Sequence, residues 1–272
     1  MRPNETHLTL TMDGLPIHVW RAGAVGAQPL LLAHGFTDAA IVWQTLVDHL
    51  SADYDVIAYD GRGHGQSARV TERYTLMDLT RECLGVIDAL GLTQPVIIGH
   101  SMGAAIAALA AWQAPHKLRA VVLEDPPITE TVALTHEDMQ NWKAQILTQQ
   151  SAPPEFVREV YRTQLYPTWS EADIETRIAA RQMLDVAVFD LMDWADTPRW
   201  QDWHSQVECK ALLLTGDPAL GGIVRPETTA RLMAGWRGLQ HVHVPTAGHH
   251  IRCSDFAAYW QALEPFLKDV CS

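Results

Sequence analysis

A serine with the surroundings of a nucleophile stands at position 101, in the pentapeptide G-H-S-M-G of residues 99–103. An apolar run at residues 95–98 precedes this G-x-S-x-G pattern and an alanine-rich segment follows it, which predicts a strand, a sharp turn and a helix. Flanking glycines permit the strained turn that exposes the Ser101 hydroxyl, and the amino end of the helix favours negative charge beside it. The pattern therefore predicts a nucleophile elbow.

A serine nucleophile needs a base beside it and a third group that orients the base. Among the thirteen histidines, His249 follows Gly248 after a strand pattern at residues 239–244. A helical pattern at residues 254–267 comes next, so His249 is expected on a loop at the sheet edge, with His250 as the alternative base.

Continuous apolar runs, typical of strands buried on both faces, alternate with helical patterns along the chain. Two shorter strand patterns come first and are joined at Asp13-Gly14, a strong hairpin signal. We expect a mostly parallel sheet with helices on both faces, preceded by an antiparallel hairpin. The predicted strands are residues 7–12, 16–21, 29–33, 55–59, 95–98, 118–123, 210–214 and 239–244, and the predicted helices are residues 41–50, 75–90, 102–114 and 254–267.

The alternation of strands and helices stops between residues 123 and 210, where the chain is helix-like, polar and rich in aromatic residues. An insertion of this length between neighbouring strands has to leave and rejoin the carboxyl edge of the sheet, where ligands bind in open α/β sheets. We interpret residues 127–206 as a helical cap on a core domain made of residues 1–126 and 207–272. Five of the ten tryptophans lie in the cap, where most are expected to pack and one or two to line the substrate cavity: Trp142, Trp169, Trp194, Trp200 and Trp203.

Two further motifs complete a family resemblance. His34-Gly35-Phe36 follows the third predicted strand, and D-G-R-G-H-G-Q-S at residues 60–67 follows the fourth. With the elbow and Gly248-His249, they make the chain resemble an α/β-hydrolase from about residue 15 to the carboxyl terminus. The resemblance implies the α/β-hydrolase fold, a mostly parallel eight-stranded sheet with helices on both faces and an inserted helical cap. Residues 60–67 are interpreted as an architectural glycine turn.

The resemblance also implies an oxyanion hole formed by the backbone amides of Phe36 and Met102. Such a donor pair stabilises the negative charge that develops on a carbonyl oxygen during acyl transfer. The alternative for His34-Gly35 is a plain turn from strand to loop. Trp43, His34 and His100 are the predicted substrate contacts, and Trp43 faces either the pocket or the core.

The third member of the triad departs from the commonest family pattern, in which an acid lies three residues past the glycine that ends a late strand. Here that glycine is Gly216, the position holds Ala219, and Asp217 directly follows the glycine. Other relatives carry the acid at the end of the strand after the nucleophile's helix, which corresponds to Asp125. We favour Asp125 slightly over Asp217, with Glu124 a weaker alternative; each would fix the tautomer of His249.

Composition limits the partners and cofactors. The net charge is −12 with no run of lysine or arginine, which argues against nucleic acid or an anionic membrane as partner. The longest apolar stretch, residues 104–112, is too short to span a bilayer, and the first residues do not resemble a secretory signal, so a cytoplasmic location is expected. No metal or cofactor is predicted, because the scattered cysteines lack zinc-ligand spacing: Cys83, Cys209, Cys253 and Cys271.

The function predicted is that of a serine hydrolase that cleaves a carboxylic ester or lactone of a small apolar substrate through an acyl-enzyme at Ser101. A serine at the elbow argues against the haloalkane dehalogenase and epoxide hydrolase branches of the family, which need an aspartate there. Carbon–carbon bond hydrolysis, cofactor-free perhydrolysis and a small-molecule receptor with vestigial hydrolysis are the alternatives. The sequence leaves the substrate, and the choice between monomer and homodimer, open.

Overall fold

The computed structural model describes residues 4–128 and 135–272. Its main sheet has eight strands in the order β1-β2-β4-β3-β6-β7-β9-β10, and every neighbouring pair from β4 to β10 is parallel. The predicted mostly parallel sheet with an antiparallel hairpin at one edge is confirmed. The strands are β1 (Thr6–Met12), β2 (Leu15–Gly23), β3 (Pro29–Ala33), β4 (Asp55–Tyr59), β6 (Val96–His100), β7 (Ala120–Glu124), β9 (Lys210–Gly216) and β10 (Leu239–Val244).

The hairpin turns at the dipeptide that the sequence indicated. Asp13 and Gly14 have φ angles of 49° and 81°, the pair of positive values that a two-residue type I′ turn requires. Met12 and Leu15 are consequently partners in the register of β1 and β2.

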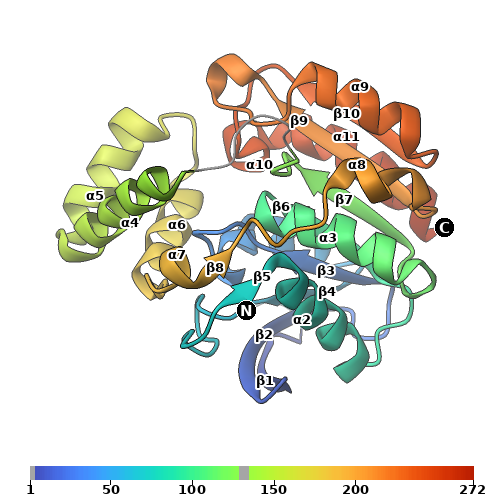
Figure 1. Ribbon diagram of the computed structural model, residues 1–272, viewed down its shortest axis with the longest axis horizontal. Helices are drawn as coiled ribbons and strands as arrows, with labels where there is room; N and C mark the ends of the chain where they lie inside the picture. The colour runs from blue at the N-terminus through green and yellow to red at the C-terminus, as the bar shows by residue number, and fades with distance from the viewer. Residues whose placement is uncertain (1–3, 129–134) are drawn as a thin grey trace.

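Helices cover both faces of the sheet (Figure 1). One apolar core lies between the sheet and the helices α2 and α3, and a second lies between the opposite face and the helices α1 and α11. The bounds are η1 (Ala40–Trp43), α1 (Gln44–Leu50), α2 (Leu76–Ala89), α3 (Met102–Gln113), η2 (Pro115–Lys117), η5 (Pro218–Leu220), α9 (Pro226–Gly235), α10 (Ile251–Ser254) and α11 (Phe256–Cys271). None of the helices in the described ranges is both long and apolar enough to cross a membrane.

The turn of residues 60–67 has the architectural role that the sequence indicated. Asp60 is buried and accepts hydrogen bonds from the backbone amides of Ala40 at 2.6 Å and Gln66 at 3.0 Å. Its Oδ2 also lies 2.8 Å from Nδ1 of His18. Asp60 thus ties the turn to β2 and to the start of η1.

The segment between β7 and β9 forms a group of helices beside the sheet (Figure 1). It has a small apolar core of its own, made by Val157, Tyr161, Ile174 and Ile178. A short parallel pairing of β5 with β8 connects it to the body. In the body, β5 comprises Tyr74–Thr75. The segment itself contains α4 (His136–Ser151), α5 (Pro154–Val160), η3 (Tyr161–Leu165), α6 (Glu171–Met183), α7 (Val188–Leu191), β8 (Met192–Asp193), α8 (Trp200–Trp203) and η4 (His204–Gln206). Residues 127–206 remain our proposed limits for a cap.

Candidate active site

Ser101 lies in the sharp turn between β6 and α3. Its backbone has φ 52° and ψ −119°, a combination that residues other than glycine rarely adopt. The strain is therefore at the serine itself, whereas the flanking glycines serve close packing. A Cβ on Gly103 would lie 2.0 Å from the carbonyl oxygen of Ala33, and one on Gly99 would lie 2.2 Å from that of Gly103. The two glycines thus let α3 begin directly against the sheet.

His249 is paired with Asp125. Nδ1 of His249 lies 2.7 Å from Oδ2 of Asp125, so the ring donates its N–H to the carboxylate and presents Nε2 with a free lone pair. Asp125 is fully buried, and it also accepts hydrogen bonds from the backbone amides of Ile223 at 2.9 Å and Val224 at 3.3 Å. The carboxylate is held in one orientation by three donors.

The environment of His249 favours its neutral form. Burial lowers the pKa of His249 below its usual value, the nearby His100 acts in the same direction, and the hydrogen bond to Asp125 opposes them. A quarter of the side chain, 25%, remains exposed. The ring is thus kept as a base with access to solvent.

The other two candidate acids have different partners. Oδ1 of Asp217 accepts a hydrogen bond from the backbone amide of Ala219 at 2.7 Å, and so caps η5. Glu124 binds Arg252, accepting from its backbone amide at 3.0 Å and from Nη1 at 2.8 Å. The hydrogen-bond partner of His249 is Asp125 and neither of these two carboxylates. The structure therefore favours Asp125 over Asp217 as the orienting acid.

The loop after β3 is anchored by His64. Nε2 of His64 lies 2.7 Å from the carbonyl oxygen of Phe36, and Nδ1 lies 2.8 Å from that of Arg62. Burial lowers the pKa of His64 to about 4, and the neutral ring donates its single N–H to one of these two carbonyl oxygens. Its contact fixes the peptide that follows Phe36, on the loop where the family resemblance implies one donor of an oxyanion hole.

Aromatic side chains from the inserted segment surround Phe36. The ring centroid of Phe36 lies 5.5 Å from Trp142, 5.1 Å from Phe189 and 5.2 Å from Trp194, all with edge-on geometry. We call these four residues the aromatic group. Sequence reasoning picked out the tryptophans as a class but missed Phe189, because nothing in the order of residues brings α7 to this loop.

His34 and His100, two of the predicted substrate contacts, are buried and contact other parts of the protein. His34 is 2% exposed; its Nδ1 lies 2.8 Å from the carbonyl oxygen of Gly35, and its Nε2 accepts from the amide of Gly61 at 3.0 Å. His100 is 1% exposed, with Nε2 3.0 Å from the carbonyl oxygen of His249 and Nδ1 3.4 Å from Asp38. Both rings are buried and are held by backbone groups of neighbouring loops, so they support these loops.

Trp43 is likewise in the core and not on a substrate surface. It is completely buried in the core beneath α1 and α11, and the guanidinium carbon of Arg252 lies 4.0 Å from its ring centroid. The choice that the sequence left open for Trp43 is decided by this packing.

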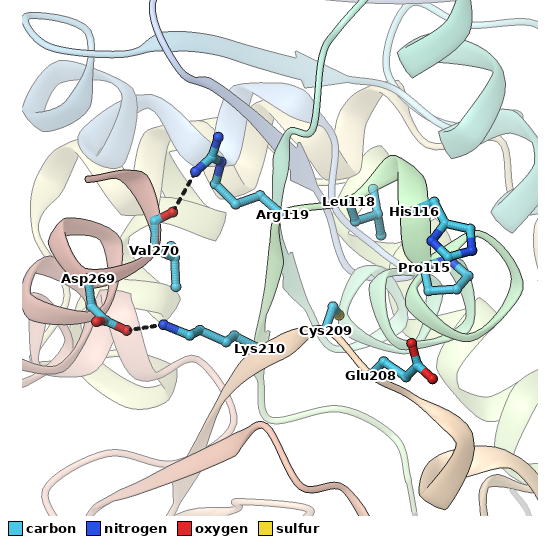
Figure 2. A pocket seen from close by; sticks show the side chains of 9 residues that line it. All are labelled: Pro115, His116, Leu118, Arg119, Glu208, Cys209, Lys210, Asp269 and Val270. Carbon is cyan, nitrogen blue, oxygen red and sulfur yellow. Dashed lines mark hydrogen bonds and ion pairs between the residues drawn. The ribbon is translucent and has the colours of Figure 1, made fainter.

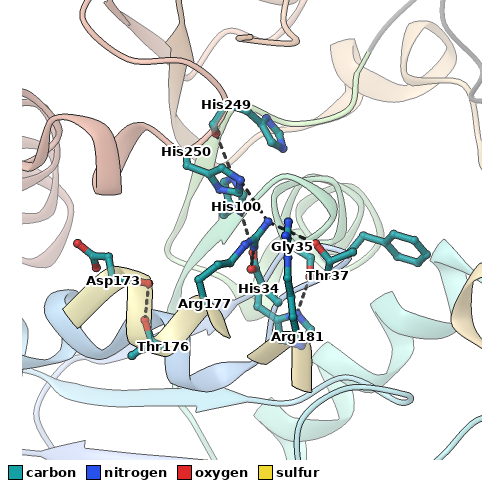
Figure 3. A network of polar contacts seen from close by, with 12 residues as sticks. His34, Gly35, Thr37, His100, Asp173, Thr176, Arg177, Arg181, His249 and His250 are labelled. Atoms are coloured by element: carbon teal, nitrogen blue, oxygen red, sulfur yellow. Dashed lines mark hydrogen bonds and ion pairs between the residues drawn. The ribbon is translucent and has the colours of Figure 1, made fainter. Parts of the chain in front are cut away.

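A cluster of charged and imidazole groups adjoins the loop of residues 245–250, which carries His249 and which we call the histidine loop (Figure 3). Donor atoms of Asp38, His100 and His250 lie within 4.8 Å of one another, the kind of spacing a metal ion requires. However, Arg177 forms an ion pair with Asp38, and its Nη2 is 3.4 Å from Nε2 of His250. A guanidinium in the middle of the group opposes binding of a cation. His250, the alternative base, contacts Arg177 here and not Asp125.

The cavity in Figure 2 lies away from Ser101. It has a volume of about 340 Å³ and is lined by residues such as Arg119, Cys209 and Lys210. These residues precede or begin β7 and β9, whereas Ser101 follows the carboxyl end of β6. In a parallel sheet the amino ends and the carboxyl ends of the strands lie on opposite sides, so we do not connect this cavity with the chemistry of Ser101.

Comparison with known proteins agrees with this fold. A family model described as the alpha/beta hydrolase fold matches residues 28–252. The match covers most of the chain, and the protein therefore belongs to the alpha/beta hydrolase fold family.

Particular relatives differ in how much of their length is matched. The chain is 27% identical over 263 residues to N-formylmaleamate deformylase of Pseudomonas putida, which is 95% of both proteins. It is 35% identical over 113 residues to epoxide hydrolase A of Mycobacterium tuberculosis, which is 40% of this chain and 34% of that protein. The chain spans less than half the length of that relative and of several other curated relatives.

A solved structure shows the same fold along almost the whole chain. The crystal structure of an N-formylmaleamic acid deformylase from Pseudomonas putida S16 superposes with a TM-score of 0.79 at 22% identity. The alignment covers 95% of this chain and 100% of that one.

Proposed function

We propose that this protein is a serine hydrolase that cleaves a carboxylic ester or lactone through an acyl-enzyme at Ser101. The observation that carries the proposal is the 2.7 Å contact between His249 and Asp125, because it leaves Nε2 of His249 available as a base. The strained turn that exposes Ser101 at the start of α3 supports the role of nucleophile.

The proposed reaction uses groups of five residues of this chain. Nε2 of His249 takes the proton of the Ser101 hydroxyl as the oxygen attacks the carbonyl carbon, and Asp125 stabilises the imidazolium that forms. The amides of Phe36 and Met102 bind the developing oxyanion. His249 then protonates the leaving group, and water, activated by the same ring, releases the acyl group from Ser101.

A second candidate reaction is hydrolysis of an N-formyl amide. It is favoured by the match to N-formylmaleamate deformylase over 95% of both chains. The same groups would serve, since attack on an amide carbonyl also needs a nucleophile, a base and an oxyanion hole. We do not extend epoxide hydrolysis to this chain, because Ser101 stands where the resemblance to that branch requires an aspartate.

The test is proton release by the purified protein with short-chain esters, long-chain esters, lactones and N-formyl amides. Many turnovers of one class, with Ser101→Ala inert and equally well folded, are the expected result. Failure of every class in a folded sample would overturn the proposal, and tight ligand binding without turnover would favour a receptor. The proposal includes a cytoplasmic location and a monomer or homodimer.

A further inference from the structure

Three arginines are buried beside the candidate active site. Arg177 and Arg181 lie on α6, Arg252 lies in α10 directly after the histidine loop, and their exposures are only 5%, 8% and 5%. An arginine is almost never this buried unless an acid balances its charge, because transfer of an unpaired ion out of water is very unfavourable. The partners of the three side chains are therefore informative.

Two of the three charges are balanced by buried carboxylates. Arg252 is bound to Glu124, with Nη1 at 2.8 Å from Oε2. Arg177 forms an ion pair with Asp38, which is 1% exposed. Glu124 and Asp38 are thus each paired with one arginine.

Arg181 has only neutral partners. Its Nη1 donates to the side-chain oxygen of Gln149 at 2.8 Å and to the hydroxyl of Tyr161, and its guanidinium carbon lies 5.5 Å from the ring centroid of Tyr161. Its Nε is buried without a hydrogen-bond partner. Within residues 4–128 and 135–272, no ion pair joins Arg181 to a carboxylate, so its charge is not balanced there.

The histidines nearby do not change this balance. Burial lowers the pKa of His100 to about 4 and that of His250 well below its usual value, so both rings are neutral near pH 7. Burial lowers the pKa of Arg177, and the charge of Arg181 acts in the same direction. Asp38 is therefore paired with Arg177, whereas Arg181 has no ion-pair partner among the described residues.

Arg177 and Arg181 lie together in the polar network that includes His249 and His250 (Figure 3). Nη2 of Arg177 donates to the hydroxyl of Thr37 at 3.3 Å, and Thr37 directly follows Phe36. The same nitrogen lies 3.4 Å from His250, the residue after His249. A group bound beside Arg177 would therefore lie next to the two loops that carry Phe36 and His249.

We propose that the substrate carries a carboxylate near its scissile carbonyl, and that Arg181, with Arg177, binds this carboxylate. This inference rests on the proposed function, which it narrows from esters and amides in general to those of dicarboxylic half-acids. The substrate anion supplies the counter-charge that Arg181 lacks, and the guanidinium fork matches a carboxylate in shape and charge. The aromatic group packs against the uncharged remainder of the substrate.

The test compares two esters that differ only in this group, monomethyl succinate and dimethyl succinate. We expect the wild-type protein to hydrolyse the monomethyl ester with a kcat/KM at least about tenfold higher, the effect of one charge-assisted contact. Arg181→Gln should abolish this preference while hydrolysis of the dimethyl ester persists. Arg158→Gln, which changes a partly exposed arginine of α5, is the matched control and should keep the preference.

A binding measurement separates the subsite from the chemistry. Calorimetric titration of succinate into Ser101→Ala protein should show binding that is lost in the Ser101→Ala, Arg181→Gln double variant and partly kept with Arg181→Lys. Succinate binding without hydrolysis of either ester would support the subsite and overturn ester hydrolysis. Hydrolysis of both esters without preference, or with a preference that survives Arg181→Gln, would overturn the subsite alone. If Arg181→Gln does not fold, the Ser101→Ala protein with Arg181 intact still provides a test. Absence of succinate binding to that protein would overturn the proposed subsite.

Discussion

Asp125 and His249 are separated by 124 positions in the sequence, and their side chains meet with Nδ1 and Oδ2 2.7 Å apart. The backbone of Asp125 has a φ of 42°, a value that is uncommon for residues other than glycine, although aspartate adopts it more often than most. This left-handed conformation comes directly after β7 and coincides with a carboxylate that is held by two further backbone amides. The local strain is thus located where the carboxylate must be fixed.

The first prediction concerns this carboxylate. Asp125→Asn should lower kcat by about ten-thousand-fold, because an amide in this position favours the wrong tautomer of the histidine, as it does in other triads. Steady-state kinetics on the best ester of the panel measure the loss. Asp217→Asn, at the residue that caps η5, is the matched control and should retain nearly full activity. A larger loss with Asp217→Asn than with Asp125→Asn would refute our assignment.

A second prediction follows from the strained backbone of Ser101. Ser101→Ala and Ser101→Gly both remove the hydroxyl and should both be inactive, but only glycine adopts φ 52° and ψ −119° without strain. We expect Ser101→Gly to be more stable than Ser101→Ala by about 1 kcal/mol, even though glycine makes the unfolded chain more flexible. Urea unfolding of the two variants gives the difference. Equal stability would mean that the strain released by glycine is no larger than the entropic cost of its more flexible unfolded chain.

Much of the fold was predictable from the sequence because local signals and burial agree. The continuous apolar runs at residues 29–33 and 55–59 became β3 and β4 with the predicted bounds. Asp13-Gly14 formed the predicted hairpin turn. In each case the nearest neighbours in the sequence carry the information, since a strand buried on both faces needs apolar residues at every position.

The partners within the candidate site were less predictable. The pairing of His249 with Asp125 instead of Asp217 depends on which loop reaches the ring, and both acids follow strands at the same edge of the sheet. The contact of Arg177 with Asp38 joins residues of α6 and the loop before η1, which no short-range pattern connects. Such contacts are set by how the inserted helices pack against the body.

The third prediction is the pH dependence of activity. His249 acts as a base only when neutral, and burial lowers its pKa from the usual value near 6.5. The acid limb of kcat/KM should therefore have its midpoint below pH 6.5, with full activity above it. A pH profile with a neutral ester measures this midpoint without titration of the substrate. A midpoint clearly above pH 6.5 would show that the charged form of His249 is stabilised instead.

The last prediction concerns stability in mild acid. His64 and His100 are buried, and burial lowers the pKa of each to about 4 in the folded protein, whereas the unfolded chain has a pKa near 6.5. Between these values the unfolded state binds more protons, so stability is fully present above pH 6.5 and falls as the pH is lowered towards 4. Each residue accounts for a loss on the order of 3 kcal/mol over this range.

Urea unfolding at a series of pH values between 7 and 4 measures this loss. His64→Gln should reduce the slope of stability against pH in this window, because one of the two buried titrating groups is removed. His116→Gln, which changes an exposed histidine in η2, is the control and should leave the slope as it is in the wild-type protein. A slope that is the same in His64→Gln and in the control would show that His64 does not titrate differently in the folded and unfolded chains.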